Sequence, residues 1–174
     1  MRLFFALTVS ILLSLTAKAA EPIPQLAPLA PFIGTWKTTS GSVDGSDKFE
    51  DVQKWEWAFS GKILKLTHSV NQGAYYGESL IGWDAQQQKI VYRYVNNAGF
   101  YTDGTITPIE DGIEVHEYVR GALAGPSETL SGYKIDDEGR IQAWSKFKTN
   151  DKWGEASTVT YERAPSAVVI FKDK

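Results

Sequence analysis

His68 is the residue whose type and surroundings best suit it for chemistry. It lies in the strand-like run 63–70, where the alternate residues Leu64, Leu66 and Val70 are apolar, so its side chain is expected to point inward with theirs. An inward histidine can anchor a ligand, bind a metal or haem, or act as a general base. The alternative is a core histidine whose ring is hydrogen-bonded to a neighbouring tyrosine, serine or backbone group.

Aromatic side chains recur at alternate positions in two further strand-like runs. In the run 49–59, Trp55, Trp57 and Phe59 share one face. In the run 90–96, Tyr92 and Tyr94 share one face. Aromatic walls with a few polar groups suit a flat, largely apolar ligand. We therefore predict a ligand site inside the fold, formed by His68, Trp55, Trp57, Leu66, Tyr92 and Tyr94. The alternative is that these rings simply fill the core.

Other catalytic and metal sites are poorly represented in the sequence. With two histidines and no cysteine, a three-histidine site and a thiolate site are both excluded. His116 is expected to point outward, and a two-histidine site would also need Glu117 or Glu78 to lie beside it. The chain has no Gly-x-Ser-x-Gly elbow, phosphate loop or dinucleotide-binding glycine pattern. We assign no catalytic residue, metal or cofactor.

The first residues have the layout of a secretory signal peptide, residues 1–19. Arg2 supplies a basic start, residues 3–15 an apolar stretch, and Ala17-Lys18-Ala19 a small-x-small cleavage site. The apolar stretch is shorter than the roughly 20 residues that cross a bilayer comfortably. We expect cleavage after Ala19 and a periplasmic or secreted mature protein; an uncleaved anchor is the alternative. No later segment is long and apolar enough to be a membrane helix.

The charge balance narrows the class of partner. The chain has 18 basic and 21 acidic residues, a formal net charge of −3, and loss of Arg2 and Lys18 with the signal peptide makes it more acidic. This balance argues against nucleic acid or an anionic membrane as the main partner. Because the chain has no cysteine, no disulfide stabilises it and the core must do so. We expect a monomer or a weak dimer.

The rest of the chain is a succession of strand-length runs separated by turn residues, and the last run covers residues 153–163. These runs alternate with period 2, and no stretch supports the 3.6-residue period of an amphipathic helix. Nearly every connection is of hairpin length, which favours a barrel over a Greek-key sandwich, and closure removes exposed strand edges. We therefore predict an all-β fold, a single up-and-down antiparallel β-barrel of about ten strands, over residues 32–163.

Short segments flank this barrel domain. Residues 20–31 form a proline-rich lead-in, which is either extended or makes a short turn of helix. In the helical case, Leu26 and Leu29 would pack over one end of the barrel. Residues 164–174 form a C-terminal tail that either frays or lies along the outside of the barrel.

The first and last strands of a closed barrel are neighbours. Here the first strand opens with Gly34-Thr35-Trp36 and the last one ends at Arg163. We therefore expect the Arg163 guanidinium to lie across the Trp36 indole, a cation–π contact worth about 0.5–2 kcal/mol. Gly34, Trp36 and Arg163 are accordingly predicted to have structural roles.

Three motifs occur in an order that suggests a family. They are Leu29-Ala30-Pro31-Phe32-Ile33-Gly34-Thr35-Trp36, Gly82-Trp83-Asp84 and Thr158-Val159-Thr160-Tyr161-Glu162-Arg163. In these segments the chain resembles an uncharacterised family of bacterial lipocalin-like proteins, with a Leu-x-Gly-x-Trp opening, a central Gly-Tyr/Trp-Asp and a terminal Tyr-x-Arg. The resemblance implies a calycin-type barrel, like those of lipocalins and fatty-acid-binding proteins, in which the first-strand Trp and last-strand Arg meet. It implies no activity, because such barrels have unrelated roles.

Two differences from better-known barrels limit what the resemblance implies. Fatty-acid carriers place an Arg two residues before a Tyr in the last strand, whereas here Tyr161 precedes Arg163. A fatty acid is therefore not implied. Haem-binding members of the wider barrel group use a histidine near the chain end, and this chain has none after His116.

Three functions are open at this point. The leading hypothesis is a barrel that binds a small apolar or aromatic molecule without converting it. The second is an enzyme (an isomerase, dehydratase or hydrolase) with His68 as general base, which requires a second titrating group within hydrogen-bond reach of His68. The third is a non-catalytic interaction protein with a filled core, which would dock through the Gly121–Pro126 loop or the C-terminal tail.

Overall fold

The computed structural model describes residues 21–41 and 49–172. The predicted signal peptide, residues 1–19, lies outside these residues. In chain order, the described elements are η1 (Pro24–Phe32), β1 (Gly34–Gly41), β2 (Asp51–Ala58), η2 (Phe59–Gly61), β3 (Ile63–Val70), β4 (Tyr75–Asp84), β5 (Lys89–Asn96), β6 (Tyr101–Ile109), β7 (Gly112–Arg120), β8 (Glu128–Ile135), β9 (Ile141–Thr149), β10 (Lys152–Trp153) and β11 (Ser157–Arg163).

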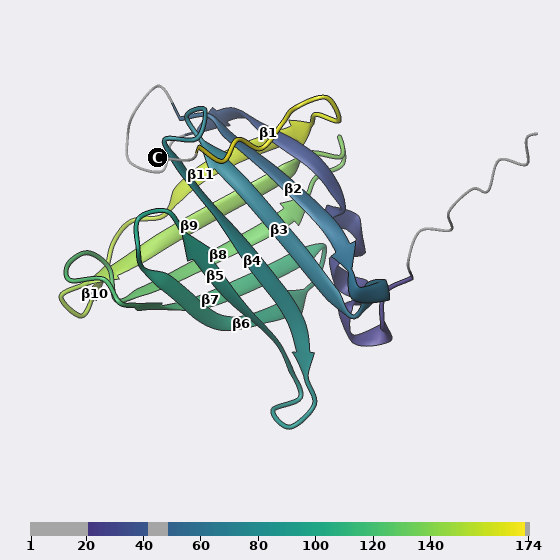
Figure 1. The fold of residues 1–174 in the computed structure, drawn as a ribbon, viewed down its shortest axis with the longest axis horizontal. Helices are drawn as coiled ribbons and strands as arrows, with labels where there is room; N and C mark the ends of the chain where they lie inside the picture. The colour runs from purple at the N-terminus through teal and green to yellow at the C-terminus, as the bar shows by residue number, and fades with distance from the viewer. Residues whose placement is uncertain (1–20, 42–48, 173–174) are drawn as a thin grey trace, which may run out of the picture.

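Ten of the eleven strands close into an antiparallel barrel (Figure 1), which confirms the predicted fold class. The chain runs up and down from β1 to β9, β9 pairs with β11, and β11 pairs with β1. The eleventh strand, β10, pairs with β9 alone and extends that strand as a short ribbon. The predicted run 153–163 is therefore not one strand: residues 154–156 leave the sheet between β10 and β11.

The end of β2 differs from the sequence prediction. We expected Phe59 to continue the inward face of Trp55 and Trp57, but β2 ends at Ala58. Phe59 and Ser60 have positive φ angles of 48° and 56°, so the chain turns sharply there. Phe59 is consequently 74% exposed and contributes nothing to the barrel interior.

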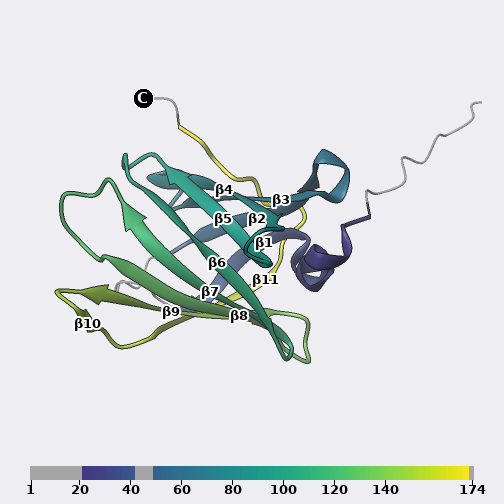
Figure 2. The same cartoon turned by 90° about the horizontal axis from the view of Figure 1, so that it is seen from below.

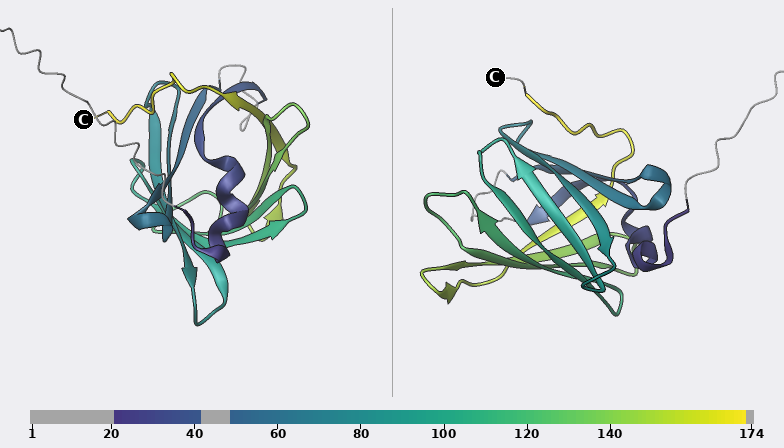
Figure 3. Two further views of the ribbon diagram at one scale, coloured as in Figure 1. Left: turned by 90° about the vertical axis from the view of Figure 1, so that its right-hand side faces the viewer. Right: turned by 60° about the horizontal axis from the view of Figure 1, so that its bottom comes forward.

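The 3₁₀ helix η1 covers one end of the barrel (Figure 3, left; Figure 2), which selects the helical alternative for the lead-in. Its Leu26, Leu29 and Phe32 are fully or almost fully buried. The Phe32 ring packs against Trp55 and Tyr133, at centroid distances of 5.5 and 6.4 Å. We call this half of the barrel the closed end. The three η1 residues fill it together with aliphatic side chains from the strands, namely Leu64, Ile81, Ile90, Ile106, Ile113 and Ile141.

The contact predicted between the first and last strands is present at the closed end. Trp36 and Arg163 are direct partners in the β1–β11 pairing, and the guanidinium lies over the indole at 4.2 Å from its centroid. Arg163 also donates hydrogen bonds to the carbonyl oxygens of Ile33 (2.9 Å) and Pro31 (3.2 Å). Gly34 has a φ of +129°, and a Cβ there would lie 2.8 Å from Nη1 of Arg163, so glycine is needed at this position.

The C-terminal tail lies along the outside of the barrel, over β3 and β4, rather than fraying (Figure 1). Ile170 donates its backbone N–H to the Ser69 hydroxyl (3.0 Å), and Phe171 stacks on Tyr76 at a centroid distance of 4.8 Å. No helix among residues 21–41 and 49–172 is long and apolar enough to cross a membrane.

Candidate functional site

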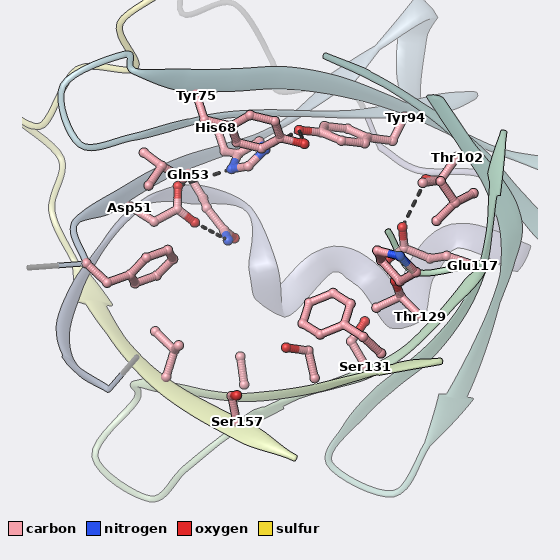
Figure 4. A pocket seen from close by; sticks show the side chains of 18 of the residues that line it. Asp51, Gln53, His68, Tyr75, Tyr94, Thr102, Glu117, Thr129, Ser131 and Ser157 are labelled. Carbon is pink, nitrogen blue, oxygen red and sulfur yellow. Dashed lines mark hydrogen bonds and ion pairs between the residues drawn. The ribbon is translucent and has the colours of Figure 1, made fainter. Parts of the chain in front are cut away.

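The half of the barrel opposite η1 is hollow. A cavity of about 510 Å³ opens at this end, and a smaller part of about 200 Å³ continues toward the closed end. The rim of the larger part is mainly apolar: Phe49, Val70, Phe100, Val119, Ala122, Ala124, Pro126 and Phe147. Polar side chains lie deeper (Figure 4), and several of them line both parts. The barrel is thus filled at the closed end and open at the other.

One wall of the cavity carries a hydrogen-bonded chain of four side chains from four strands (Figure 4). His68 Nδ1 lies 3.1 Å from Asp51 Oδ1, and His68 Nε2 lies 2.7 Å from the Tyr94 hydroxyl. The Tyr94 hydroxyl lies 2.8 Å from that of Tyr75. A Cβ at Gly77, the residue that pairs with His68, would clash with the nearest atoms of the Tyr94 ring, so this glycine leaves the space that the ring occupies.

Asp51 is the anchor of this wall. It is 2% exposed, and its Oδ2 accepts hydrogen bonds from Tyr161 and from Gln53, each at 2.9 Å. Gln53 in turn accepts a hydrogen bond from the Trp55 indole at 3.2 Å. With His68 on Oδ1, three side chains hold both carboxylate oxygens, so Asp51 is a positioning residue rather than a contact for a ligand.

The hydrogen bonds that join Asp51, His68, Tyr94 and Tyr75 can run in either of two directions. A neutral His68 donates from Nδ1 to Asp51 and accepts at Nε2 from Tyr94, which then accepts from Tyr75. A protonated His68 donates from both nitrogens, and Tyr94 then donates to Tyr75. In both cases the two ring nitrogens contact protein groups, so coordination of a metal by His68 would first require breaking one of these bonds. No cluster of three or more metal-ligating side chains occurs in the part of the chain that the structure describes.

Glu117 lies on β7 and lines both parts of the cavity, away from the Asp51–His68 wall (Figure 4). Thr102 Oγ1 donates a hydrogen bond to Glu117 Oε2 at 2.9 Å. The buried Tyr92 hydroxyl lies near the same carboxyl without reaching hydrogen-bonding geometry. Desolvation raises the pKa of Glu117, and the hydrogen bond from Thr102 opposes this only in part.

The cavity tyrosines remain hydrogen-bond donors at neutral pH. Burial is the main cause that raises the pKa values of Tyr75, Tyr92, Tyr94 and Tyr133, and the nearby Glu117 charge raises them further. The interior therefore offers phenol hydroxyls, one imidazole and one weakly solvated carboxyl.

Replacing Glu117 by glutamine is expected to change how stability depends on pH. Since burial raises the folded-state pKa of Glu117 above its ordinary 4.5, the folded protein holds this proton more tightly than the unfolded chain. The resulting stability is fully present below the ordinary pKa and is lost as pH rises through the folded-state pKa. The non-titrating Glu117→Gln variant should therefore gain stability relative to wild type as pH rises, and the gain should level off above the folded-state pKa.

Urea unfolding of both proteins from about pH 4 to pH 8 measures this difference. The titratable groups that line the cavity near Glu117 are His68 and the four cavity tyrosines, which lie on β3, β4, β5 and β8. His116, the residue before Glu117, lies on the outer face of β7. A matched control is Glu114→Gln, an exposed position on the same strand, which should follow wild type at every pH. A difference between Glu117→Gln and wild type that stays constant over this range would contradict the prediction.

Most of the residues predicted from the sequence line this cavity. His68 and Tyr94 line both parts, and Trp55, Leu66 and Tyr92 line the smaller one. Trp57 lies in neither lining; it is partly buried and packs against the core.

Sequence reasoning missed Asp51, Gln53 and Glu117 as interior residues. The period-2 rule contained the information, because Asp51 and Gln53 have the same parity as Trp55. Glu117 likewise alternates with the buried Val115. His116, by contrast, points outward as predicted and lies 2.9 Å from Glu128.

Comparisons with known proteins identify a similar fold but indicate no function. No family model matches the chain, and no curated protein matches it. Among solved structures, that of Rv2717c from M. tuberculosis is similar, with a TM-score of 0.57 and 15% sequence identity over 83% of this chain and 99% of the other. At this identity the likeness shows a shared barrel architecture alone.

Proposed function

We propose that the protein, after export, binds a small, largely apolar molecule inside its barrel. The observation that carries this proposal is the cavity of about 510 Å³ at the open end. This volume falls within the range of about 300–1,000 Å³ typical of small-molecule sites. An apolar rim above a few convergent polar groups is also the usual composition of such sites.

Export and family membership belong to the same proposal. The basic, apolar and small-x-small segments of residues 1–19 support cleavage and a periplasmic or secreted location. The contact between Trp36 and Arg163 supports membership of the lipocalin-like bacterial family, since it joins the opening and terminal motifs on which the resemblance depends.

Binding of the neutral, apolar dye Nile red tests the proposal. The dye should show a blue-shifted, enhanced emission in the cavity, and saturating dye should raise the unfolding temperature. Ala124 lines the rim, so Ala124→Trp should obstruct the entrance and weaken binding by about threefold to tenfold.

Leu123→Trp is the matched control for this test. Leu123 belongs to the same loop but is fully exposed, so this variant should bind Nile red like wild type. If neither Nile red nor other neutral apolar compounds bind, or if the two variants behave alike, the interior is not a binding site.

The Asp51–His68–Tyr94–Tyr75 chain favours a second candidate function, acid–base catalysis in the same cavity. Two titrating groups, Asp51 and Tyr94, lie within hydrogen-bond reach of His68, as the enzyme hypothesis required. In that case Tyr75, at the end of the chain, would exchange a proton with the bound molecule. Mass spectrometry of recovered ligands separates the two functions: a binding protein returns them unchanged, whereas an enzyme converts one, and Tyr75→Phe abolishes the conversion.

A further inference from the structure

We propose that the ligand carries a cationic amine group and that Glu117 is the residue that pairs with it. This inference rests on the proposed function and names the chemical class of the molecule that the cavity takes. It depends on the position of Glu117, on the lack of a Lys or Arg among the described residues that line the cavity, and on the tyrosines that line it with Glu117.

Glu117 lies where the two parts of the cavity meet. It lines both of them, together with Gln53, His68, Tyr75, Tyr94, Ser131 and Tyr133. A ligand whose apolar body occupies the larger part and whose polar end points inward would therefore bring that end to Glu117. The apolar rim at the open end suits the body of such a molecule.

The Glu117 carboxyl has no Lys or Arg partner among the described residues. No Lys or Arg is among the lining residues of either part, within residues 21–41 and 49–172. Two imidazoles, those of His68 and His116, lower the pKa of Glu117, and their influence is weaker than that of desolvation. Glu117 is half-buried and faces the cavity. A carboxylate that is largely removed from water is normally paired with a cation, so this side chain lacks the partner that an amine ligand would supply.

Asp51 cannot take the same role. Both of its oxygens are held by protein donors: His68 on one, and Gln53 and Tyr161 on the other. The Glu117 carboxyl, by comparison, accepts one hydrogen bond, from Thr102. Of the two acids in the cavity, Glu117 is therefore the one available to a ligand.

Four tyrosines line the smaller part of the cavity together with Glu117. The Glu117 charge affects the pKa values of Tyr75, Tyr92, Tyr94 and Tyr133, which places all four phenols within electrostatic reach of this carboxyl. An ammonium group is attracted by the faces of aromatic rings as well as by a carboxylate. It would also offset the desolvation that raises the pKa of Glu117.

An anionic ligand fits this interior poorly. A carboxylate or phosphate would lie near two acids, and no lysine or arginine among the described lining residues would balance its charge. Like charges in a low-dielectric site repel. This agrees with the reversed Tyr161–Arg163 order, because Arg163 is occupied outside the cavity by Trp36 and two carbonyl groups.

Displacement of bound Nile red by octylamine, octanol and octanoate tests the proposal at neutral pH. The three probes have the same alkyl chain and differ in the charge of the head group. A charge-assisted contact in a desolvated site should make octylamine bind at least about tenfold more tightly than octanol, with octanoate weakest. In Glu117→Gln, octylamine should lose this advantage and fall to within about threefold of octanol, whose affinity should stay the same.

Glu114→Gln is the matched control, since it removes a carboxylate from the exposed face of the same strand and should leave all three affinities unchanged. Octanol or octanoate binding as tightly as octylamine would overturn the inference while leaving the binding function intact. Equal losses for all three probes in Glu117→Gln would show that this residue does not contact the head group. If Nile red itself fails to bind, the proposed function is the part that is wrong.

Discussion

Trp36→Ala is expected to lower the free energy of unfolding by about 3–5 kcal/mol, the range for removing a large aromatic side chain from a core. Trp36 is fully buried, and its indole N–H donates to the Phe32 carbonyl oxygen at 2.7 Å. Its loss would leave a cavity between η1 and the sheet and remove the surface on which Arg163 lies. Urea unfolding followed by circular dichroism measures the change.

Trp153→Ala is the control for this experiment. Trp153 lies on the two-residue strand β10 and is 40% exposed, so its removal should cost less than about 1 kcal/mol. A double-mutant cycle with Arg163→Ala should give a coupling energy of about 0.5–2 kcal/mol for the Trp36–Arg163 pair. If Trp36→Ala and Trp153→Ala lower the free energy of unfolding by similar amounts, the packing of Trp36 at the closed end does not stabilise the barrel.

Asp51→Asn is expected to destabilise the protein by about 2–4 kcal/mol, because it leaves buried donors without an acceptor. Three side chains donate to, or share a proton with, the two carboxylate oxygens. An asparagine has one acceptor oxygen and turns an NH₂ group toward the remaining donors. The His68–Tyr94 part of the chain would also lose its anchor, so Nile red affinity should fall as well.

Asp103→Asn is the matched control, because Asp103 is an aspartate whose ion pairs lie outside the cavity. Asp103 lies on the outer face, 3.2 Å from Arg120 and 3.5 Å from Arg93, and these pairs are well exposed. Exposed pairs contribute about 0–1 kcal/mol, so this variant should stay close to wild type. An Asp51→Asn protein as stable as Asp103→Asn would show that the network around Asp51 is not needed for folding.

The strands and their inward faces were largely predictable. The inward direction of His68, Tyr92 and Tyr94 follows from alternation within each strand, and the outward direction of Arg93 and His116 follows from the same rule. The predicted inward direction of Phe59 was wrong because alternation does not show where a strand ends. The positive φ angles at Phe59 and Ser60 depend on the turn that leads into β3.

By itself, the sequence determined a barrel of about ten antiparallel strands and most of its inward side chains, because alternation and turn residues are local properties of the chain. Only the tertiary structure decided which end is filled and which is hollow, since that depends on where η1 packs. It alone also brought Asp51 beside His68, and Thr102 beside Glu117. Such pairs join different strands, and they depend on a register that no single strand encodes.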